Sequence, residues 1–182
     1  FVVLVQLGTL VAVIAYFWKD LVAMFKAVIA GIRSKKPLQE ANSRLGWYIV
    51  LATIPAGLGG LLLKSKVEAA FSSPVLTAVL LFVTAVILTL AEIFSRKERD
   101  LESVTPKDAI VIGLSQLLAI FPGISRSGAT ISGGLSRGLK REAAARFSFL
   151  MSIPIMLAAG LLSVLDLLKI PDLGSFLPII LV

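Results

Sequence analysis

Long apolar runs alternate with short charged stretches along the whole chain. Such runs predict membrane-crossing helices, because about 20 apolar residues at ~1.5 Å per residue span the hydrocarbon core of a bilayer. A shorter apolar run at 21–32, interrupted by Lys26, is instead typical of a helix that lies along the membrane surface. We predict membrane spans at residues 1–18, 46–63, 75–94 and 147–165, with the start of another at residue 176.

The stretch 109–139 departs from this pattern. Two mostly apolar runs, 109–121 and 129–139, flank the loop Pro122-Gly-Ile-Ser-Arg-Ser-Gly128, and neither is long enough to cross a bilayer. Irregular backbone survives at membrane depth only where protein or a wet cavity surrounds it. We therefore predict a re-entrant hairpin of two half-length helices at 109–139. The fold class predicted is an all-α polytopic membrane protein that forms a single membrane domain over residues 1–182.

The composition supports a membrane protein and removes several kinds of chemistry. Hydrophobic residues make up 57% of the chain and charged residues 16%, which excludes a soluble domain and a disordered chain. The sequence contains no Cys and no His, so it offers no disulfide, thiolate nucleophile, imidazole base or His-ligated zinc. The formal net charge is +7, but the basic residues lie between apolar runs. That distribution indicates cytoplasmic loops and no nucleic-acid partner.

The loop charges predict an orientation. Residues 19–44 hold six Lys and Arg and residues 96–107 hold four, whereas residues 64–73, predicted to be a short loop, hold two. The positive-inside tendency places the first two of these segments in the cytoplasm. The hairpin then leaves from the cytoplasmic side and returns there, and we expect its tip to reach the middle of the membrane.

The first and last predicted spans resemble each other. At an offset of 146, Phe1 aligns with Phe147 and Leu4 with Leu150, although apolar matches also arise by chance in membrane helices. The two spans are predicted to run in opposite directions, as an inverted-topology repeat requires. A repeat would place a partner hairpin before Phe1. Because the chain opens and closes inside apolar runs, we interpret it as part of a longer protein.

The polar loop at the hairpin tip is the candidate site, and its residues favour an anion such as a phosphate or diphosphate. Arg126 would be an ionisable group between two apolar half-helices, and its planar fork of donors matches phosphate oxygens. The helix after the loop adds free N–H groups and a positive dipole end. Close backbone approach is expected at Gly123 and Gly128, and hydroxyl donors at Ser125, Ser127 and Thr130.

Structural roles are the alternatives for these residues. Arg126 could cap carbonyl groups or pair with an acid elsewhere in the chain. One of Ser125 and Ser127 is expected to be the N-cap of the second half-helix, whatever else it does. Gln116 could form hydrogen bonds within the helix bundle or contact a ligand, and we count it among the candidate substrate-binding residues.

The segment from Gln116 to Gly134, which contains Pro-Gly-Ile-Ser-Arg-Ser-Gly-Ala-Thr, resembles the second signature motif of the bacterial undecaprenyl-diphosphate phosphatases, also called bacitracin-resistance proteins. The opening residues 1–8 and the segment 147–150 are also similar to that family, and the resemblance covers essentially the whole chain. It implies a multi-pass enzyme of the bacterial inner membrane with two re-entrant hairpins in inverted repeats. Such an enzyme removes the terminal phosphate of undecaprenyl diphosphate and recycles the lipid carrier for peptidoglycan synthesis.

The resemblance also implies a division of the active site. The family's first motif, a Glu-rich stretch followed by a loop with Ser and His, would precede this chain. The general base or nucleophile, and the carboxylate ligands of a divalent cation (Mg or Ca), are therefore expected outside it, and this chain alone is expected to be inactive. No metal ligand is assigned here. The catalytic residues implied are Arg126, Ser125, Ser127 and Thr130, and the substrate-binding residues are Gly123, Gly128 and Gln116.

Two other functions fit parts of the pattern. A transporter or flippase would also bind an anionic substrate at the end of a broken helix, without chemistry. A non-catalytic remnant of the family would have the same residues. The partners expected are undecaprenyl diphosphate and the bilayer, and the sequence leaves a homodimer open.

Overall fold

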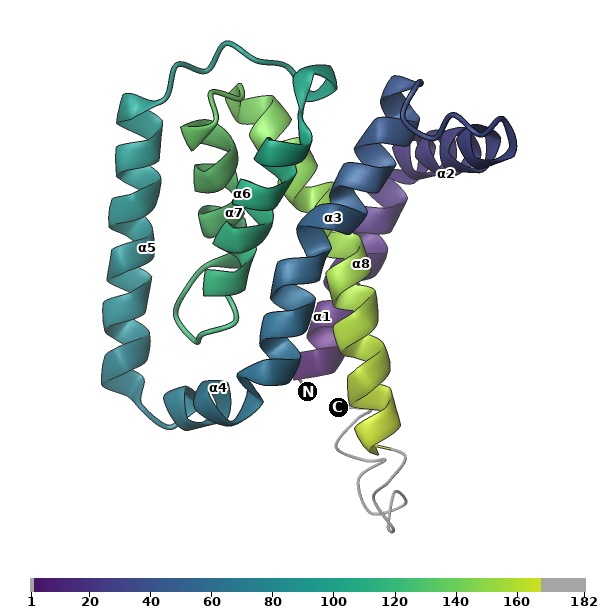
Figure 1. Cartoon of the computed structure of the whole chain (residues 1–182). Helices are drawn as coiled ribbons and strands as arrows, with labels where there is room; N and C mark the ends of the chain where they lie inside the picture. The colour runs from purple at the N-terminus through teal and green to yellow at the C-terminus, as the bar shows by residue number, and fades with distance from the viewer. Residues whose placement is uncertain (1, 168–182) are drawn as a thin grey trace.

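The computed structural model describes residues 2–167, which form helices joined by turns (Figure 1). This confirms the predicted all-α class. The elements in the described residues are α1 (Val2–Tyr16), α2 (Trp18–Arg33), α3 (Ala41–Leu62), α4 (Lys64–Phe71), α5 (Pro74–Phe94), the short 3-10 helix η1 (Leu101–Ser103), α6 (Pro106–Leu118), α7 (Arg126–Ser136) and α8 (Arg141–Leu167). The start of a further span predicted at residue 176 lies outside the described residues.

Three helices in the described part of the chain are long and apolar enough to cross a membrane: α3, α5 and the Arg141–Leu161 part of α8. They correspond to the predicted spans 46–63, 75–94 and 147–165. The predicted span 1–18 differs, because α1 ends at Tyr16 and reaches the required length only together with α2, to which it is bent by 73°. The chain is thus a multi-pass membrane protein, and α2 corresponds to the predicted surface helix at 21–32.

The segment 64–73 differs from its prediction as a short loop. Residues Lys64–Phe71 form the helix α4, since this stretch contains good helix formers and no Gly or Pro. The chain then turns into α5 at Ser73, whose hydroxyl caps the new helix, with Pro74 at its first position. The apolar spans were predictable from the length of their apolar runs. The eight residues of α4 mix apolar and charged side chains, and their hydrophobic pattern is too short to predict a helix.

Helices α6 and α7 form the predicted hairpin, which lies between α5 on one side and α3 on the other (Figure 1). Helix α6 packs mainly against α3, and α7 packs against α5 and α8. The contact between α6 and α3 is close because a Cβ on Gly113 would lie 2.5 Å from the Ala52 carbonyl oxygen. Small residues at this crossing let the two backbones approach, as is usual between membrane helices.

The hairpin tip, residues 119–125, lies near the end of α5 that adjoins α4. Gly123 lies against the backbone of Thr77, so close that a Cβ would collide with the Thr77 carbonyl oxygen, and its φ is +90°. Both features require glycine there. Thr77 is in the first turn of α5, only about 5 Å along a helix roughly 30 Å long. The tip therefore lies near the end of α5 that is remote from the hairpin's base, and its depth in the membrane stays a prediction.

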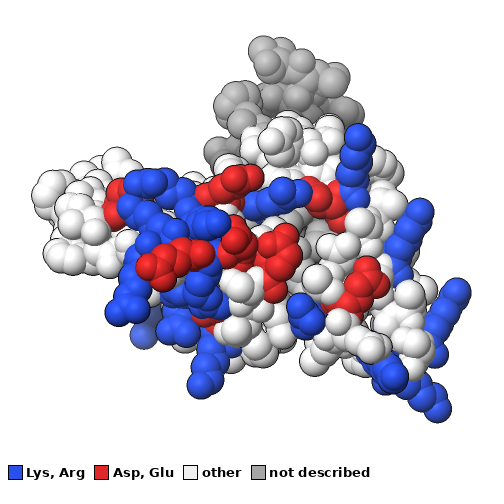
Figure 2. Space-filling view, turned by 90° about the horizontal axis from the view of Figure 1, so that it is seen from above, with Lys and Arg blue, Asp and Glu red and all other residues white. Residues whose placement is uncertain are grey.

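Charged side chains gather at one end of the molecule, which Figure 2 shows face-on. At this charged end α5 finishes, and α6 and α8 begin; the segment from α5 to η1 crosses the top of Figure 1, and the segment between α2 and α3 lies at its upper right. Helix α4 lies at the opposite end (Figure 1). Basic residues thus segregate as the loop-charge argument requires, and the assignment of the charged end to the cytoplasm stays a prediction.

Helices α1 and α8 pack side by side and run in opposite directions (Figure 1). At their charged ends Phe17, which is 8% exposed, stacks on Phe149 with ring centroids 6.3 Å apart. The opposed directions agree with the predicted relation between the first and last spans. The inverted repeat itself stays a prediction.

Candidate functional site

The base of the hairpin is closed by a buried carboxylate that the sequence analysis did not single out. Asp108, in the first turn of α6, has no solvent exposure. Its Oδ2 accepts hydrogen bonds from Arg99 Nη2 at 2.7 Å and from the backbone N–H and hydroxyl of Thr105. Its Oδ1 accepts a bond from Arg137 Nε at 2.8 Å. One carboxylate therefore joins the start of α6 to the end of α7.

Hydrogen bonds explain why this buried group stays ionised. Burial alone would raise the pKa of Asp108, but bonds from Arg99, Arg137 and Thr105 outweigh it and hold the pKa well below its usual range. The hydrogen bond between Arg99 and Asp108 also raises the pKa of Arg99. We call Asp108, Arg99 and Arg137 the base network.

Backbone pairing reinforces the base network. Arg99 N–H donates to the Gly138 carbonyl at 3.0 Å, and Lys140 N–H donates to the Arg99 carbonyl at 2.8 Å. Arg99 also donates from Nη1 to the Arg137 carbonyl at 2.9 Å. The loop after α5 is thus attached to the end of α7, so the hairpin is fixed at the charged end while its tip lies far inside.

At the tip, Arg126 begins α7 and is half-buried. Its Nη2 contacts Met156 Sδ on α8 at 3.2 Å, a weak acceptor for a guanidinium. None of the ion pairs among the described residues involves Arg126. The alternative in which Arg126 pairs with an acid therefore finds no support in the described part of the chain, and most of its donors are open to a ligand.

The two serines of the loop have different surroundings. Ser125 is the N-cap of α7, because its Oγ accepts a bond from Gly128 N–H at 3.2 Å. Ser127 is exposed, and its Oγ lies 3.4 Å from Ser125 Oγ. Both hydroxyl groups therefore lie at the start of α7, on the residues that flank Arg126 in the sequence. Gly128 is buried, and a Cβ there would lie 3.0 Å from Thr84 Cγ2 on α5, so it serves close packing as well as the cap.

Thr130 is turned away from this group. Its hydroxyl lies 2.6 Å from Ser148 Oγ on α8 and 2.8 Å from the Arg126 carbonyl oxygen, and the residue is 1% exposed. Ser125, Arg126 and Ser127 are thus consecutive at the start of α7, whereas Thr130 lies in the contact between α7 and α8. Gly123 likewise lies against α5.

Gln116 is 2% exposed, and neither polar atom of its amide has a hydrogen-bond partner among the described residues. One turn earlier on α6, Gly113 faces α3 and Ile112 faces α7, so Gln116 projects into the bundle on that same side. A buried amide without partners costs free energy. The Gln116 amide therefore forms no hydrogen bond within the bundle among the described residues. Gln116 stays a candidate for contact with a ligand.

The residues present do not form a cation site. No group of three or more His, Cys, Asp and Glu residues gathers in the described part of the chain. Asp108, the carboxylate in the first turn of α6, already accepts hydrogen bonds on both oxygens from Arg99, Arg137 and Thr105. The donors beside Arg126 are hydroxyl and guanidinium groups, which suit an anion and not a divalent cation.

Comparison with known proteins identifies the family. The chain matches a family model described as bacitracin resistance protein BacA over residues 1–180. It is similar to an undecaprenyl-diphosphatase of Mycolicibacterium smegmatis, at 45% identity over 91% of this chain and 60% of that protein. It is also similar to undecaprenyl-diphosphatases of Thermomicrobium roseum (43% identity, 93% and 63%) and Moorella thermoacetica (44%, 92% and 62%).

These comparisons agree with the motif resemblance and extend it beyond the tip loop. The chain spans about three fifths of the length of the curated relatives it matches, between 60% and 63% for the three named above. The match nevertheless extends over almost all of this chain, through the spans as well as the hairpin. The chain therefore belongs to the bacitracin resistance protein BacA family.

Proposed function

We propose that this chain provides the diphosphate-binding half of an undecaprenyl-diphosphate phosphatase of the bacterial inner membrane. The observation that supports this most is the group of donors at the start of α7. Arg126 has no acidic partner among the described residues, and in the sequence it stands between Ser125, the N-cap of α7, and Ser127, whose hydroxyl groups lie 3.4 Å apart. A cationic group left without a counter-ion inside a membrane protein favours an anionic ligand.

Each group has a distinct part in the proposed site. Arg126 binds the terminal phosphate through two parallel N–H donors and stabilises the negative charge that shifts as the phosphoryl group is transferred. Ser127 donates one hydrogen bond to a phosphate oxygen. The first intrahelical bond of α7 is donated by Ala129 to the Ser125 carbonyl, and Gly128 N–H donates to Ser125 Oγ, so the N–H groups of Arg126 and Ser127 are available to the anion. Gln116 is a further proposed contact.

The position of the tip supports a lipid substrate. Gly123 lies against Thr77 in the first turn of α5, and Gly128 packs on Thr84 at the middle of that helix, so the donor group lies between these two levels. If the charged end faces the cytoplasm, that position is in the outer half of the bilayer, on the side where the diphosphate of a prenyl lipid in the outer leaflet would lie. Removal of its terminal phosphate would return the carrier to peptidoglycan synthesis.

The remaining chemistry is assigned to residues outside this chain. The described residues offer no general base beside Arg126 and no carboxylate cluster for a cation. We therefore propose that the nucleophile or base and the ligands of any Mg or Ca come from other parts of the full-length protein. Helix α5 packs on the described residues mainly through α7 and exposes a long apolar face, as expected of a helix that faces lipid.

One assay separates the enzyme from a transporter. The full-length protein is reconstituted in liposomes with undecaprenyl diphosphate, and the release of inorganic phosphate is measured together with movement of the lipid between leaflets. A phosphatase releases phosphate in proportion to the amount of protein. Movement of intact diphosphate lipid between leaflets with no phosphate release would contradict the proposal and favour a flippase.

A further inference from the structure

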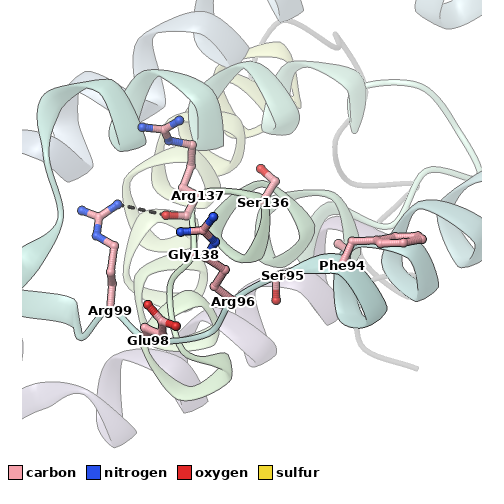
Figure 3. Close-up of a pocket in the computed structure, with 9 residues that line it drawn as sticks. Phe94, Ser95, Arg96, Glu98, Arg99, Ser136, Arg137 and Gly138 are labelled. Carbon is pink, nitrogen blue, oxygen red and sulfur yellow. Dashed lines mark hydrogen bonds between the residues drawn. The ribbon is translucent and has the colours of Figure 1, made fainter.

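A second basic hollow lies at the charged end, away from Arg126. It encloses about 510 Å³ between the end of α5 and the end of α7. Figure 3 shows that its arginines come from two segments, Arg96 and Arg99 from the loop after α5 and Arg137 from the end of α7. Ser95, Ser136 and the Phe94 side chain complete this part of the lining.

The charges of the hollow leave an excess of positive charge. Arg99 and Arg137 share the single carboxylate of Asp108, so one positive charge remains in the base network. Arg96 adds another, and no ion pair or hydrogen bond of its guanidinium occurs among the described residues. Glu98 is the acid of the lining and offsets one of the two. A monoanion would therefore balance the hollow.

Hydrogen-bond donors also remain unused there. The base network engages only Nε of Arg137, which leaves the terminal nitrogens of that side chain for a ligand. All five N–H donors of Arg96 are available. In the wall, the Ser95 hydroxyl is buried with no hydrogen-bond partner in the described part of the chain. These donors are spread over several nitrogen and oxygen atoms, so they match the several oxygens of a phosphate group better than they match an anion that acts as a single point charge.

An apolar groove adjoins the hollow and extends into the membrane-spanning region. It encloses about 320 Å³ between α5 and α7, and Ile87, Leu90 and Ala129 contribute to its walls. Ala91 and Ser136 line both the groove and the basic hollow, so the two adjoin at these residues. Beside their junction, Phe94 is 77% exposed at the end of the α5 span. The basic hollow therefore lies at headgroup depth, and the groove lies at the depth of hydrocarbon chains.

We propose that the hollow and the groove together bind an anionic membrane lipid, with its phosphate headgroup between Arg96 and Arg137 and one hydrocarbon chain along the groove. The apolar groove favours a lipid over free phosphate, because a free anion would leave the groove unused. The site is separated from Arg126 by the length of α7 and does not depend on the proposed phosphatase function. Its occupant would hold α5 against the hairpin from the side of the bilayer.

The test measures lipid binding to the full-length protein in a neutral detergent. Phosphatidylglycerol and phosphatidylcholine with the same fluorescent acyl chain are titrated onto wild type, Arg96→Gln and Arg33→Gln. Arg96→Gln should weaken phosphatidylglycerol binding about tenfold, as expected for the loss of hydrogen bonds to a charged group. Arg33→Gln removes one positive charge from an exposed position at the charged end, and it should change the affinity for phosphatidylglycerol less than twofold. Phosphatidylcholine should bind more weakly than phosphatidylglycerol to the wild type.

A groove variant distinguishes the lipid from a free anion. Ile87→Trp fills the groove from α5, and it should weaken binding of phosphatidylglycerol while leaving the charged hollow unchanged. Inorganic phosphate in excess should compete poorly in the wild type. The proposal is overturned if Arg96→Gln and Arg33→Gln weaken binding equally, or if the two lipids bind equally well. Efficient competition by phosphate, together with normal lipid binding by Ile87→Trp, would overturn the lipid assignment in favour of a free-anion site.

Discussion

Asp108, in the first turn of α6, and Arg137, at the end of α7, are 29 residues apart in the sequence but meet at the base of the hairpin, where Arg137 Nε donates a 2.8 Å bond to Asp108 Oδ1. The carboxylate has no solvent exposure, while the arginine side chain is 39% exposed. The hairpin is thus closed by a charge pair at the end where water is near, and its tip with Arg126 extends from this fixed base. The position of the donor group at the tip depends on a contact formed about one helix length away.

Removing this carboxylate should destabilise the protein. Asp108→Asn leaves Arg99 and Arg137 without their shared counter-ion. We expect the free energy of unfolding to fall by about 3 kcal/mol. This value is at the lower end of the range for breaking a buried ion pair, because both arginines remain partly solvated. The measurement is thermal unfolding in detergent. Asp100→Asn, which breaks an exposed pair with Lys140, is the matched control and should leave the midpoint almost unchanged. Equal midpoints for the two variants would show that the base network contributes little.

The stabilisation by Asp108 should disappear in acid. Its pKa is lowered in the folded protein, so its contribution is complete above the unfolded pKa of about 4 and is lost as the pH falls through the folded value. The difference in stability between wild type and Asp108→Asn should therefore be constant around neutral pH and shrink only below about pH 4. Thermal unfolding of both proteins across this range measures it. A difference that already closes near pH 6 would mean that the carboxyl is not held in its ionised form.

Thr130 and Ser127 should affect different properties. Thr130→Val leaves Ser148 without its buried partner, which should cost about 1–2 kcal/mol of stability and leave turnover per folded molecule near the wild-type value. Ser127→Ala removes an exposed hydroxyl beside Arg126, so stability should be unchanged and turnover of the full-length enzyme should fall about fivefold. If folded Thr130→Val instead loses turnover, Thr130 belongs to the group of residues that contacts the phosphate.

Gln116 offers a test of a buried residue without partners. If its amide is kept for a ligand, Gln116→Leu should keep or slightly raise the unfolding midpoint, because an unpaired polar group is replaced by an apolar one of similar size. The same variant should raise the KM for the prenyl diphosphate. A clear loss of stability would instead show that the amide forms hydrogen bonds that hold the bundle together.

Local patterns made much of the fold predictable. The spans follow from the length of apolar runs, and the Pro-Gly-x-Ser-Arg-Ser-Gly string indicated both the break between α6 and α7 and the donors at the tip. Ser125 was foreseen as one of two N-cap candidates for the same reason, since capping depends on neighbouring residues. The Thr105 to Asp108 spacing is a capping box that could have marked the start of α6.

Contacts between distant segments were not predictable. Nothing near Asp108 in the sequence indicates that Arg137 will reach it, because that pairing depends on the direction in which α7 returns. The rotamer of Thr130, which is turned toward Ser148 on α8, likewise depends on packing between helices. The position of the tip along α5 depends on the fit of Gly123 against Thr77, which a hydropathy pattern does not encode.

The central claim is that Arg126 binds and stabilises the transferring phosphoryl group. The most direct measurement is turnover per folded molecule of full-length Arg126→Lys and Arg126→Ala, with thermal stability in detergent recorded for each. Both variants should remain folded, since Arg126 forms no ion pair among the described residues. Arg126→Lys keeps the charge without the bidentate fork and should lose much of the rate, and Arg126→Ala should lose about 10²–10³-fold. A folded Arg126→Ala protein with ordinary turnover would contradict the account and remove Arg126 from the site.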